Sequence, residues 1–144
     1  MPDTPELAPD LHAATPPWLF IHLREWISGT DDKGHAYLVV SEDAEEASLF
    51  TKQLAMQQLC RDPLDRMACR QCQSCKAFLQ GTHGDLLLLQ VPEGKTAIGI
   101  DQVREGTHFL QQTALYGATK LLLVIGADQM TLAAANSLLK TLEE

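Results

Sequence analysis

The sequence lacks an apolar run long enough to cross a membrane, since a spanning helix needs about 20 consecutive apolar residues. Its first residues, MPDTPELAPDLHAATPPW, are acidic and rich in proline. They contain neither the basic start nor the apolar centre of a secretory signal peptide. We therefore expect a cytoplasmic protein without a membrane partner, in a compartment where thiols stay reduced.

The sequence also lacks a surplus of basic residues. Eleven Lys and Arg stand against nineteen Asp and Glu, and the formal net charge is −8. A domain that binds DNA directly needs a cluster of cations to displace counterions from the phosphates. The small basic group of Arg61, Arg66 and Arg70 motivates an independent nucleic-acid-binding module as one alternative, which the net charge disfavours.

Cysteine is absent outside one short stretch, CRDPLDRMACRQCQSC. The four cysteines are Cys60, Cys69, Cys72 and Cys75, with the spacing C-x8-C-x2-C-x2-C. Three cysteines two residues apart can surround one tetrahedral ion, and Cys60 is near enough in sequence to return as the fourth ligand. Structural zinc sites favour such sets of four thiolates with short C-x2-C turns. The pattern therefore predicts a structural zinc site with no open position for a water nucleophile.

Other interpretations of the four cysteines remain open at this point. Disulfides at this spacing would be strained, and a reducing compartment would break them. An iron–sulfur cluster uses the same ligands, although its common bacterial run has a different last spacing and a following proline. A redox pair or plain packing are further alternatives. His83, eight residues beyond Cys75, is expected to be a loop residue and not a ligand.

Three short apolar runs predict buried strands of a parallel sheet, because their apolar residues follow one another without alternation. The runs are His35–Val40, Asp85–Gln90 and Lys120–Ile125. Helical patterns separate them, which predicts a three-layer α/β fold with helices on both faces of the sheet. Four of the predicted helices are Pro17–Trp26, Ser41–Leu59 capped by Ser41, a short helix that runs from after Cys72 to Gly81, and Asp101–Gln112 capped by Asp101. The last predicted helix is capped by Thr131, and its apolar face consists of Leu132, Ala135, Leu138, Leu139 and Leu142.

The turn after the first predicted strand is where a phosphate-binding loop, G-x-x-x-x-G-K-[ST], would open the next helix. Ser41 and Glu46 replace the two glycines of that motif, Ala47 replaces the lysine, and Ser48 alone matches. Acidic residues crowd the same helix start. Each like-charge contact with a phosphate at about 4 Å costs about 1 to 4 kcal/mol. The sequence therefore predicts a degenerate loop that holds no nucleotide.

The acidic pair that holds magnesium in a nucleotide hydrolase should end a neighbouring core strand. Here the run LLLVI leads directly into Gly126 and Ala127, and the nearest acid is Asp128. Without the lysine and the acidic pair, neither charge neutralisation nor water activation is available. We therefore expect no catalytic residue.

These features together resemble a known family. The cysteine module, GTHGDL, IGIDQVR and AAANSLLKTLEE occur here in the order found in the delta-prime subunits of bacterial DNA polymerase III clamp loaders, which are AAA+-type proteins. The resemblance spans roughly Trp18 to Glu144. The catalytic gamma and tau subunits share LLKTLEE and the zinc module, but they keep the phosphate loop and an Asp-Glu pair. That pair would fall on Ile125 and Gly126 here.

The resemblance implies a non-hydrolysing structural subunit in bacterial DNA replication. Its partners would be gamma or tau and delta, in a hetero-pentameric ring that loads the sliding clamp on primed DNA. This ring would be part of a DNA polymerase holoenzyme, which is a nucleotidyltransferase. An ATP-hydrolysing gamma/tau-type subunit is the alternative. We expect residues 1–144 to form an N-terminal AAA+-like domain that is incomplete at its C-terminal end, with a zinc-binding insertion at residues 60–75.

Overall fold

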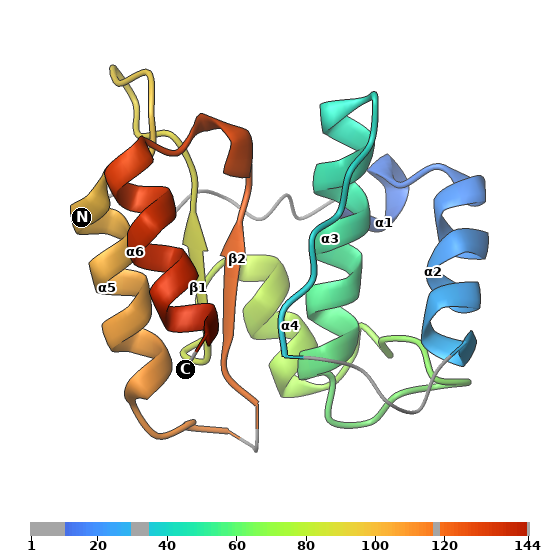
Figure 1. The fold of residues 1–144 in the computed structure, drawn as a ribbon. Coiled ribbons are helices and arrows are strands. Elements are labelled where there is room, and N and C mark those ends of the chain that lie inside the picture. The colour runs from blue at the N-terminus through green and yellow to red at the C-terminus, as the bar shows by residue number, and fades with distance from the viewer. Residues whose placement is uncertain (1–10, 30–34, 117–118, 144) are drawn as a thin grey trace. The chain divides into compact units, whose positions relative to one another are not determined.

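The computed structural model describes residues 11–29, 35–116 and 119–143 of the chain. These residues form two compact units, Met1–His83 and Gly84–Glu144. Figure 1 labels the elements of both units. None of the helices in the described residues combines the length and the apolar character that spanning a bilayer requires.

The first unit is helical. Its elements are α1 (Leu11–Ala14), α2 (Pro17–Gly29), α3 (Ala44–Leu59) and α4 (Gln73–Gln80). The predicted helix from Pro17 is confirmed, with proline in the first turn, where its missing N–H costs no hydrogen bond. The predicted short helix after Cys72 is also confirmed, and it ends at Gly81, whose φ of 74° is the left-handed conformation that favours glycine.

The start of α3 differs from the predicted one in its capping residue. Asp43 is the N-cap, and its Oδ1 accepts hydrogen bonds from the backbone N–H groups of Glu45 (2.9 Å) and Glu46 (3.3 Å). The prediction of Ser41 as the cap is wrong, because Ser41 lies too far before the first helical residue. Its Oγ instead accepts a hydrogen bond from the N–H of Asp43 at 3.1 Å.

The predicted strand His35–Val40 does not form. Residues 35–40 belong to no strand or bridge in the described chain, and Leu38 and Val40 are 79% and 82% exposed. Tyr37 packs instead with its ring edge-on to Trp26 of α2, at 5.1 Å between ring centroids. The prediction is wrong because an apolar run becomes a strand only beside a neighbouring strand, and the described part of the first unit contains none.

The second unit contains a parallel strand pair with a helical crossover. Its elements are β1 (Leu86–Leu89), α5 (Ile100–Gln111), β2 (Leu121–Val124), a 3₁₀ turn η1 (Ala127–Gln129) and α6 (Leu132–Glu143). The register pairs Leu86 with Leu121 and Leu89 with Val124. The two predicted strands in this region and their parallel direction are confirmed, and the chain is an α/β protein with a small parallel sheet.

Both helices of the second unit pack on the same face of this sheet. Leu89 of β1, Ile98, Val103 of α5 and Ala134 of α6 form one buried cluster, and Figure 1 shows α5 and α6 side by side along the strands. Gly106 allows the close approach of α5, since an added Cβ would lie 3.0 Å from both methyl groups of Leu122. The helices of this unit therefore cover one face of the strands.

The caps of these two helices match the predictions in part. Gly99 is the N-cap of α5, and its N–H donates to Oε1 of Gln102 at 3.0 Å. Asp101 lies inside the first turn, so its prediction as a cap is wrong. Thr131 does cap α6, because its Oγ1 accepts a hydrogen bond from the N–H of Ala134 at 3.1 Å.

The apolar face of α6 also differs from the prediction. Ala134 is fully buried and Leu138 packs against the core, whereas Leu132 and Leu139 are 78% and 53% exposed. The core thus follows a stripe of α6 centred on Ala134, a residue that the apolar pattern had left out. A small side chain at this position lets the helix approach its neighbours closely.

Candidate metal centre

The four cysteines come together in the first unit, although the chain between them is mostly irregular. All four sulfur atoms lie within 4.8 Å of one another. Cys60 directly follows the end of α3, Cys72 is the N-cap of α4, and Cys75 lies in the first turn of α4. Two helix ends and the loop between them therefore bring the predicted ligands to one point.

Backbone N–H groups point at the sulfurs from several sides. The N–H of Cys69 donates to Sγ of Cys60 at 3.3 Å, and the N–H of Cys75 donates to Sγ of Cys72 at 3.4 Å. Sγ of Cys69 accepts from both Gln71 (3.4 Å) and Cys72 (3.2 Å). Such donors stabilise thiolates, since hydrogen bonds to the charged form favour it.

The thiols have very different acidities. Burial would raise the pKa of Cys72, but hydrogen bonds from the backbone of Arg61 and Cys75 and from neighbouring thiols outweigh it and lower that pKa to about 6. Burial raises the pKa of Cys75 far above its usual value, and burial also raises the pKa of Cys60. Of these three thiols Cys72 therefore ionises most readily, and a metal that binds the sulfurs would displace protons from Cys60 and Cys75.

The loop that carries Cys69 is held in an unfavourable backbone conformation. Asp65, Arg66 and Arg70 have φ values of 51°, 65° and 63°, and they are the non-glycine residues with positive φ in the described chain. The left-handed region costs an ordinary residue about 1 to 2 kcal/mol. Strain of this kind persists only where the surroundings impose it, and a shared ion would impose it here.

The donor set and its geometry fit a tetrahedral ion. Zinc–sulfur bonds of about 2.3 Å put the sulfurs of a tetrahedral site about 3.8 Å apart, and the four sulfurs here all lie within 4.8 Å of one another. All four cysteines are free of disulfide bonds, so each can supply a thiolate. Cys60, Cys69, Cys72 and Cys75 would hold the ion, whose contribution would be to crosslink the ends of α3 and α4.

The other residues singled out from the sequence lie elsewhere. Ser41, Glu46, Ala47 and Ser48 lie around the start of α3, whereas the cysteines gather at its end. Glu46 accepts a hydrogen bond from Nε1 of Trp18 at 3.2 Å. The carbonyl oxygen of Arg66 accepts one from Nε2 of Gln57 at 3.1 Å. The structure therefore brings together the predicted metal ligands and places the degenerate loop apart from them.

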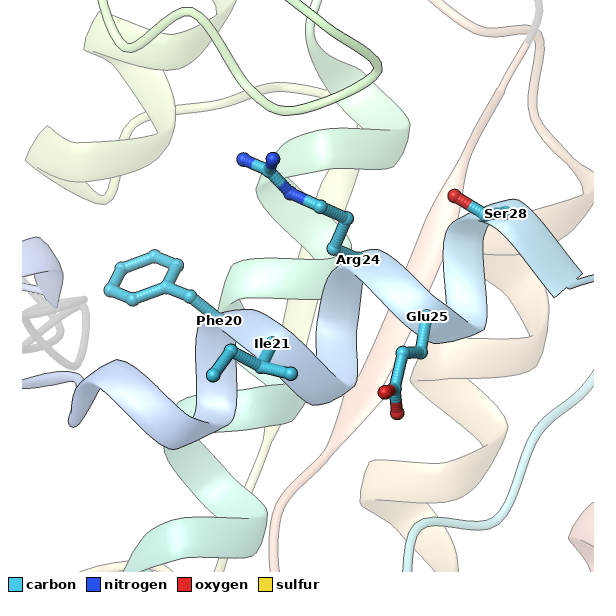
Figure 2. Close-up of a pocket in the computed structure, with 5 residues that line it drawn as sticks. All are labelled: Phe20, Ile21, Arg24, Glu25 and Ser28. Atoms are coloured by element: carbon cyan, nitrogen blue, oxygen red, sulfur yellow. The ribbon is translucent and has the colours of Figure 1, made fainter.

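A surface hollow on α2 lies outside this centre. It has a volume of about 380 Å³. Figure 2 shows the five side chains that line it, which are Phe20, Ile21, Arg24, Glu25 and Ser28. All of them project from the same helix, so the hollow is an open stretch of surface. It brings together no set of polar groups that resembles a catalytic site.

The sequence patterns missed two residues next to the centre. Ser74 and His83 are 6% and 7% exposed and lie 2.7 Å apart between Oγ and Nε2. A serine between two cysteine ligands gives no signal of its own in the sequence. The histidine was predicted to be a loop residue, and only the fold reveals that it is buried against α4.

Known proteins resemble this chain over most of its length. It is 36% identical over 118 residues to the DNA polymerase III subunit delta′ of Pseudomonas aeruginosa, which covers 82% of this chain and 36% of that protein. It is 34% identical over 132 residues to the protein of the same name from Escherichia coli, covering 89% of this chain and 39% of the relative. The corresponding protein of Haemophilus influenzae is 37% identical over 131 residues, with 89% and 39% covered.

The chain spans less than two fifths of the length of these relatives. The family described as DNA polymerase III, delta subunit, matches residues 20–144. The match includes the cysteine module, both strands and the last helix, and it confirms the resemblance drawn from the sequence motifs. The chain therefore belongs to the DNA polymerase III delta subunit family.

Proposed function

We propose that this chain is the N-terminal, AAA+-like part of a non-hydrolysing delta-prime subunit of a bacterial clamp loader. The relatives named DNA polymerase III subunit delta′ support this assignment. In this proposal β1 and β2 belong to the parallel sheet of a three-layer domain, and the cysteine module is its insertion. The subunit is cytoplasmic and acts with gamma or tau and delta in a ring that loads the sliding clamp on primed DNA.

The start of α3 is the observation that supports the non-hydrolysing role. A phosphate at this position would have to accept hydrogen bonds from the first backbone N–H groups of the helix. The carboxylate of Asp43 already accepts from two of them, at Glu45 and Glu46. Ala47 offers no cation, and Glu46 adds a second negative charge. The same helix start that favours an acidic cap therefore disfavours a triphosphate.

The end of β2 supports the same proposal. The chain passes from Val124 through Ile125 to Gly126, whose φ of 79° turns it into η1. Ile125 and Gly126, where the acidic pair would fall, do not carry the carboxylates that magnesium needs beside a phosphate. In this proposal the domain keeps the architecture of a nucleotide hydrolase and acts as a fixed surface against which ATP-binding neighbours move.

We infer that the metal is a structural zinc ion held by the four cysteines. A site with four sulfur ligands leaves no coordination position for water or substrate. Its role is then to stiffen the irregular segment between α3 and α4.

Calorimetry with ATP and magnesium tests the absence of a nucleotide site. We expect no heat beyond that of a titration with magnesium alone, which serves as the control. Micromolar binding of ATP would contradict the proposal and favour the gamma/tau-type alternative.

Metal analysis of the same sample tests the zinc assignment independently, with one zinc per chain as the expected result.

Assembly with the other subunits tests the role in the ring. We expect the protein, mixed with gamma or tau and delta, to appear in a single complex on size-exclusion chromatography. Clamp loading on primed DNA by that complex should depend on the presence of the protein. Equal loading without it would contradict the proposal.

A further inference from the structure

Ser74 lies between two of the metal ligands and connects the two helix ends that carry them. Its hydroxyl group donates a hydrogen bond of 2.6 Å to the carbonyl oxygen of Leu59. Leu59 directly precedes Cys60, and Ser74 directly precedes Cys75. One hydrogen bond therefore ties together the backbone next to two ligands that are 15 residues apart in the sequence.

His83 fixes the direction of this hydroxyl group. Its Nε2 lies 2.7 Å from Oγ of Ser74. A serine hydroxyl has a single proton, and here the carbonyl oxygen of Leu59 receives it. Nε2 must therefore carry a proton and donate to Oγ, which holds for both the neutral Nε2–H tautomer and the imidazolium.

The turn after α4 places His83 for this contact. Gly81 adopts the left-handed conformation, and the N–H of Thr82 donates to the carbonyl oxygen of Ala77 at 2.9 Å. The chain therefore reverses at the end of α4 and returns His83 along the helix to its first turn. Both His83 and Ser74 are more than nine-tenths buried, so water does not compete for these hydrogen bonds.

We propose that Ser74 and His83 form a brace outside the ligand shell that positions the sulfurs of Cys60 and Cys75, and thereby sets the affinity and the exchange rate of the metal. This inference rests on the proposed metal site. Groups that orient metal ligands change the affinity by about 10- to 100-fold when they are removed. Ser74 and His83 are positioning residues in this proposal, since neither contacts the ion.

Four variants of the protein test the brace. Ser74→Ala removes the bridging hydroxyl, and His83→Leu removes the ring donor. His83→Gln keeps a donor, because its side-chain amide nitrogen reaches the place of Nε2. Thr51→Ala is the matched control, since Oγ1 of Thr51 also donates to a carbonyl oxygen, that of Ala47 at 2.6 Å, but within α3 alone.

The first measurement is competition for zinc between each variant and a coloured chelator. We expect Ser74→Ala and His83→Leu to lower zinc affinity by about 10- to 100-fold, and His83→Gln to lower it by less than about 10-fold. Thr51→Ala should match the unsubstituted protein. The absorption bands of bound cobalt, which report tetrahedral thiolate coordination, should broaden or shift in the two disruptive variants only.

The outcomes separate the brace from the metal assignment. If the unsubstituted protein holds no zinc, the proposed metal site fails before the variants are compared. If it holds zinc and all four variants match it in affinity, the metal site stands and the brace is overturned. Should Ser74→Ala fail to fold, the pair His83→Leu and His83→Gln decides: equal affinities overturn the brace, and rescue by glutamine supports it.

Discussion

The two units of this chain hold their irregular segments in place by different means. In the second unit, the strands, helices and the loop between them contribute side chains to one buried apolar cluster, which consists of Leu89, Ile98, Val103 and Ala134. In the first unit, the segment between α3 and α4 has little apolar burial, and Leu64 within it is 60% exposed. That segment instead brings four sulfurs within 4.8 Å of one another, and these sulfurs accept hydrogen bonds from its backbone. A segment with so little apolar burial can be ordered by a crosslink in place of a core, which is the part that the proposed metal would play.

The two units also differ in how they use buried polar groups. In the second unit, the carboxylate of Asp85 is 1% exposed and accepts hydrogen bonds from the N–H groups of Leu115 (2.6 Å) and Tyr116 (2.9 Å). In the first unit, Ser74 and His83 play a comparable role beside the cysteines. Each buried group anchors one loop, so its removal should loosen that loop and leave the other unit unchanged.

Loss of the metal should give the largest effect, and only in the first unit. Cys72→Ser removes one ligand, and structural zinc binding in zinc-finger peptides is worth on the order of 10 kcal/mol. We expect the variant to lose its zinc, and hydrogen exchange to lose protection in the loop 60–72 and in α4. Protection of β1 and β2 should persist.

The matched control for this experiment is Gln71→Ala, an exposed residue of the same loop. It should keep one zinc per chain and normal protection. Simultaneous loss of protection in both units of Cys72→Ser would contradict a role confined to the first unit, because the metal would then support the whole chain.

Removal of the buried carboxylate should give the largest effect of a single side chain on the second unit. Asp85→Ala leaves two N–H groups without their acceptor, and hydrogen bonds to a charged group contribute about 1.5 to 3 kcal/mol each. We expect a loss of about 3 kcal/mol in the free energy of unfolding, measured with urea.

Asp101→Ala is the control for Asp85→Ala, since its side chain is 95% exposed and its contact with Arg104 spans 3.7 Å. Its unfolding free energy should change by less than about 0.5 kcal/mol. Equal effects of the two substitutions would show that Asp85 does not anchor the loop at residues 115–116.

Overpacking of the helix–sheet contact should give an intermediate effect. Gly106→Val adds a branched side chain where even a Cβ would lie 3.0 Å from Leu122 and 3.3 Å from Leu89. We expect a loss of about 2 kcal/mol, as for other oversized core residues. Glu105→Val introduces the same branched side chain at the exposed neighbouring position of α5. The idea of close contact is wrong if both variants unfold at the same urea concentration.

Loss of the α6 cap should give the smallest effect. Thr131→Ala removes the hydroxyl that accepts from Ala134, and an N-cap is worth about 1 kcal/mol. Thr131→Ser keeps the hydroxyl and should stay within about 0.5 kcal/mol of the unsubstituted protein. Thermal unfolding followed by circular dichroism measures both. A serine variant as unstable as the alanine variant would indicate that the methyl group, not the cap, matters.

Local patterns predicted the elements that find a packing partner within their own unit. The apolar runs of β1 and β2 were predicted because each strand has the other as its neighbour. The run His35–Val40 is also apolar, yet it forms no strand beside the helices of its own unit. The caps were harder to predict, since Ser41 and Asp43 are both good capping residues and their distance from the first turn decides between them.

The candidate metal centre was predictable for a different reason. Four cysteines at short spacing can reach one ion regardless of how the rest of the chain folds, because the spacing itself limits the distances between the sulfurs. The brace was not predictable, since Ser74 and His83 meet only after α4 has formed and the chain has turned at Gly81. A serine and a histidine nine residues apart are otherwise an ordinary pair.

The sequence by itself determined the four cysteines of the proposed ligand set, the two parallel strands, most of the helices and the membership in the delta subunit family. These properties depend on residue types and on short-range spacing. Only the tertiary structure decided which face of α6 is buried, that the Asp85 carboxylate anchors a loop, and that Ser74 and His83 lie behind the cysteines. These depend on burial and hydrogen bonds that exist only after the chain has packed.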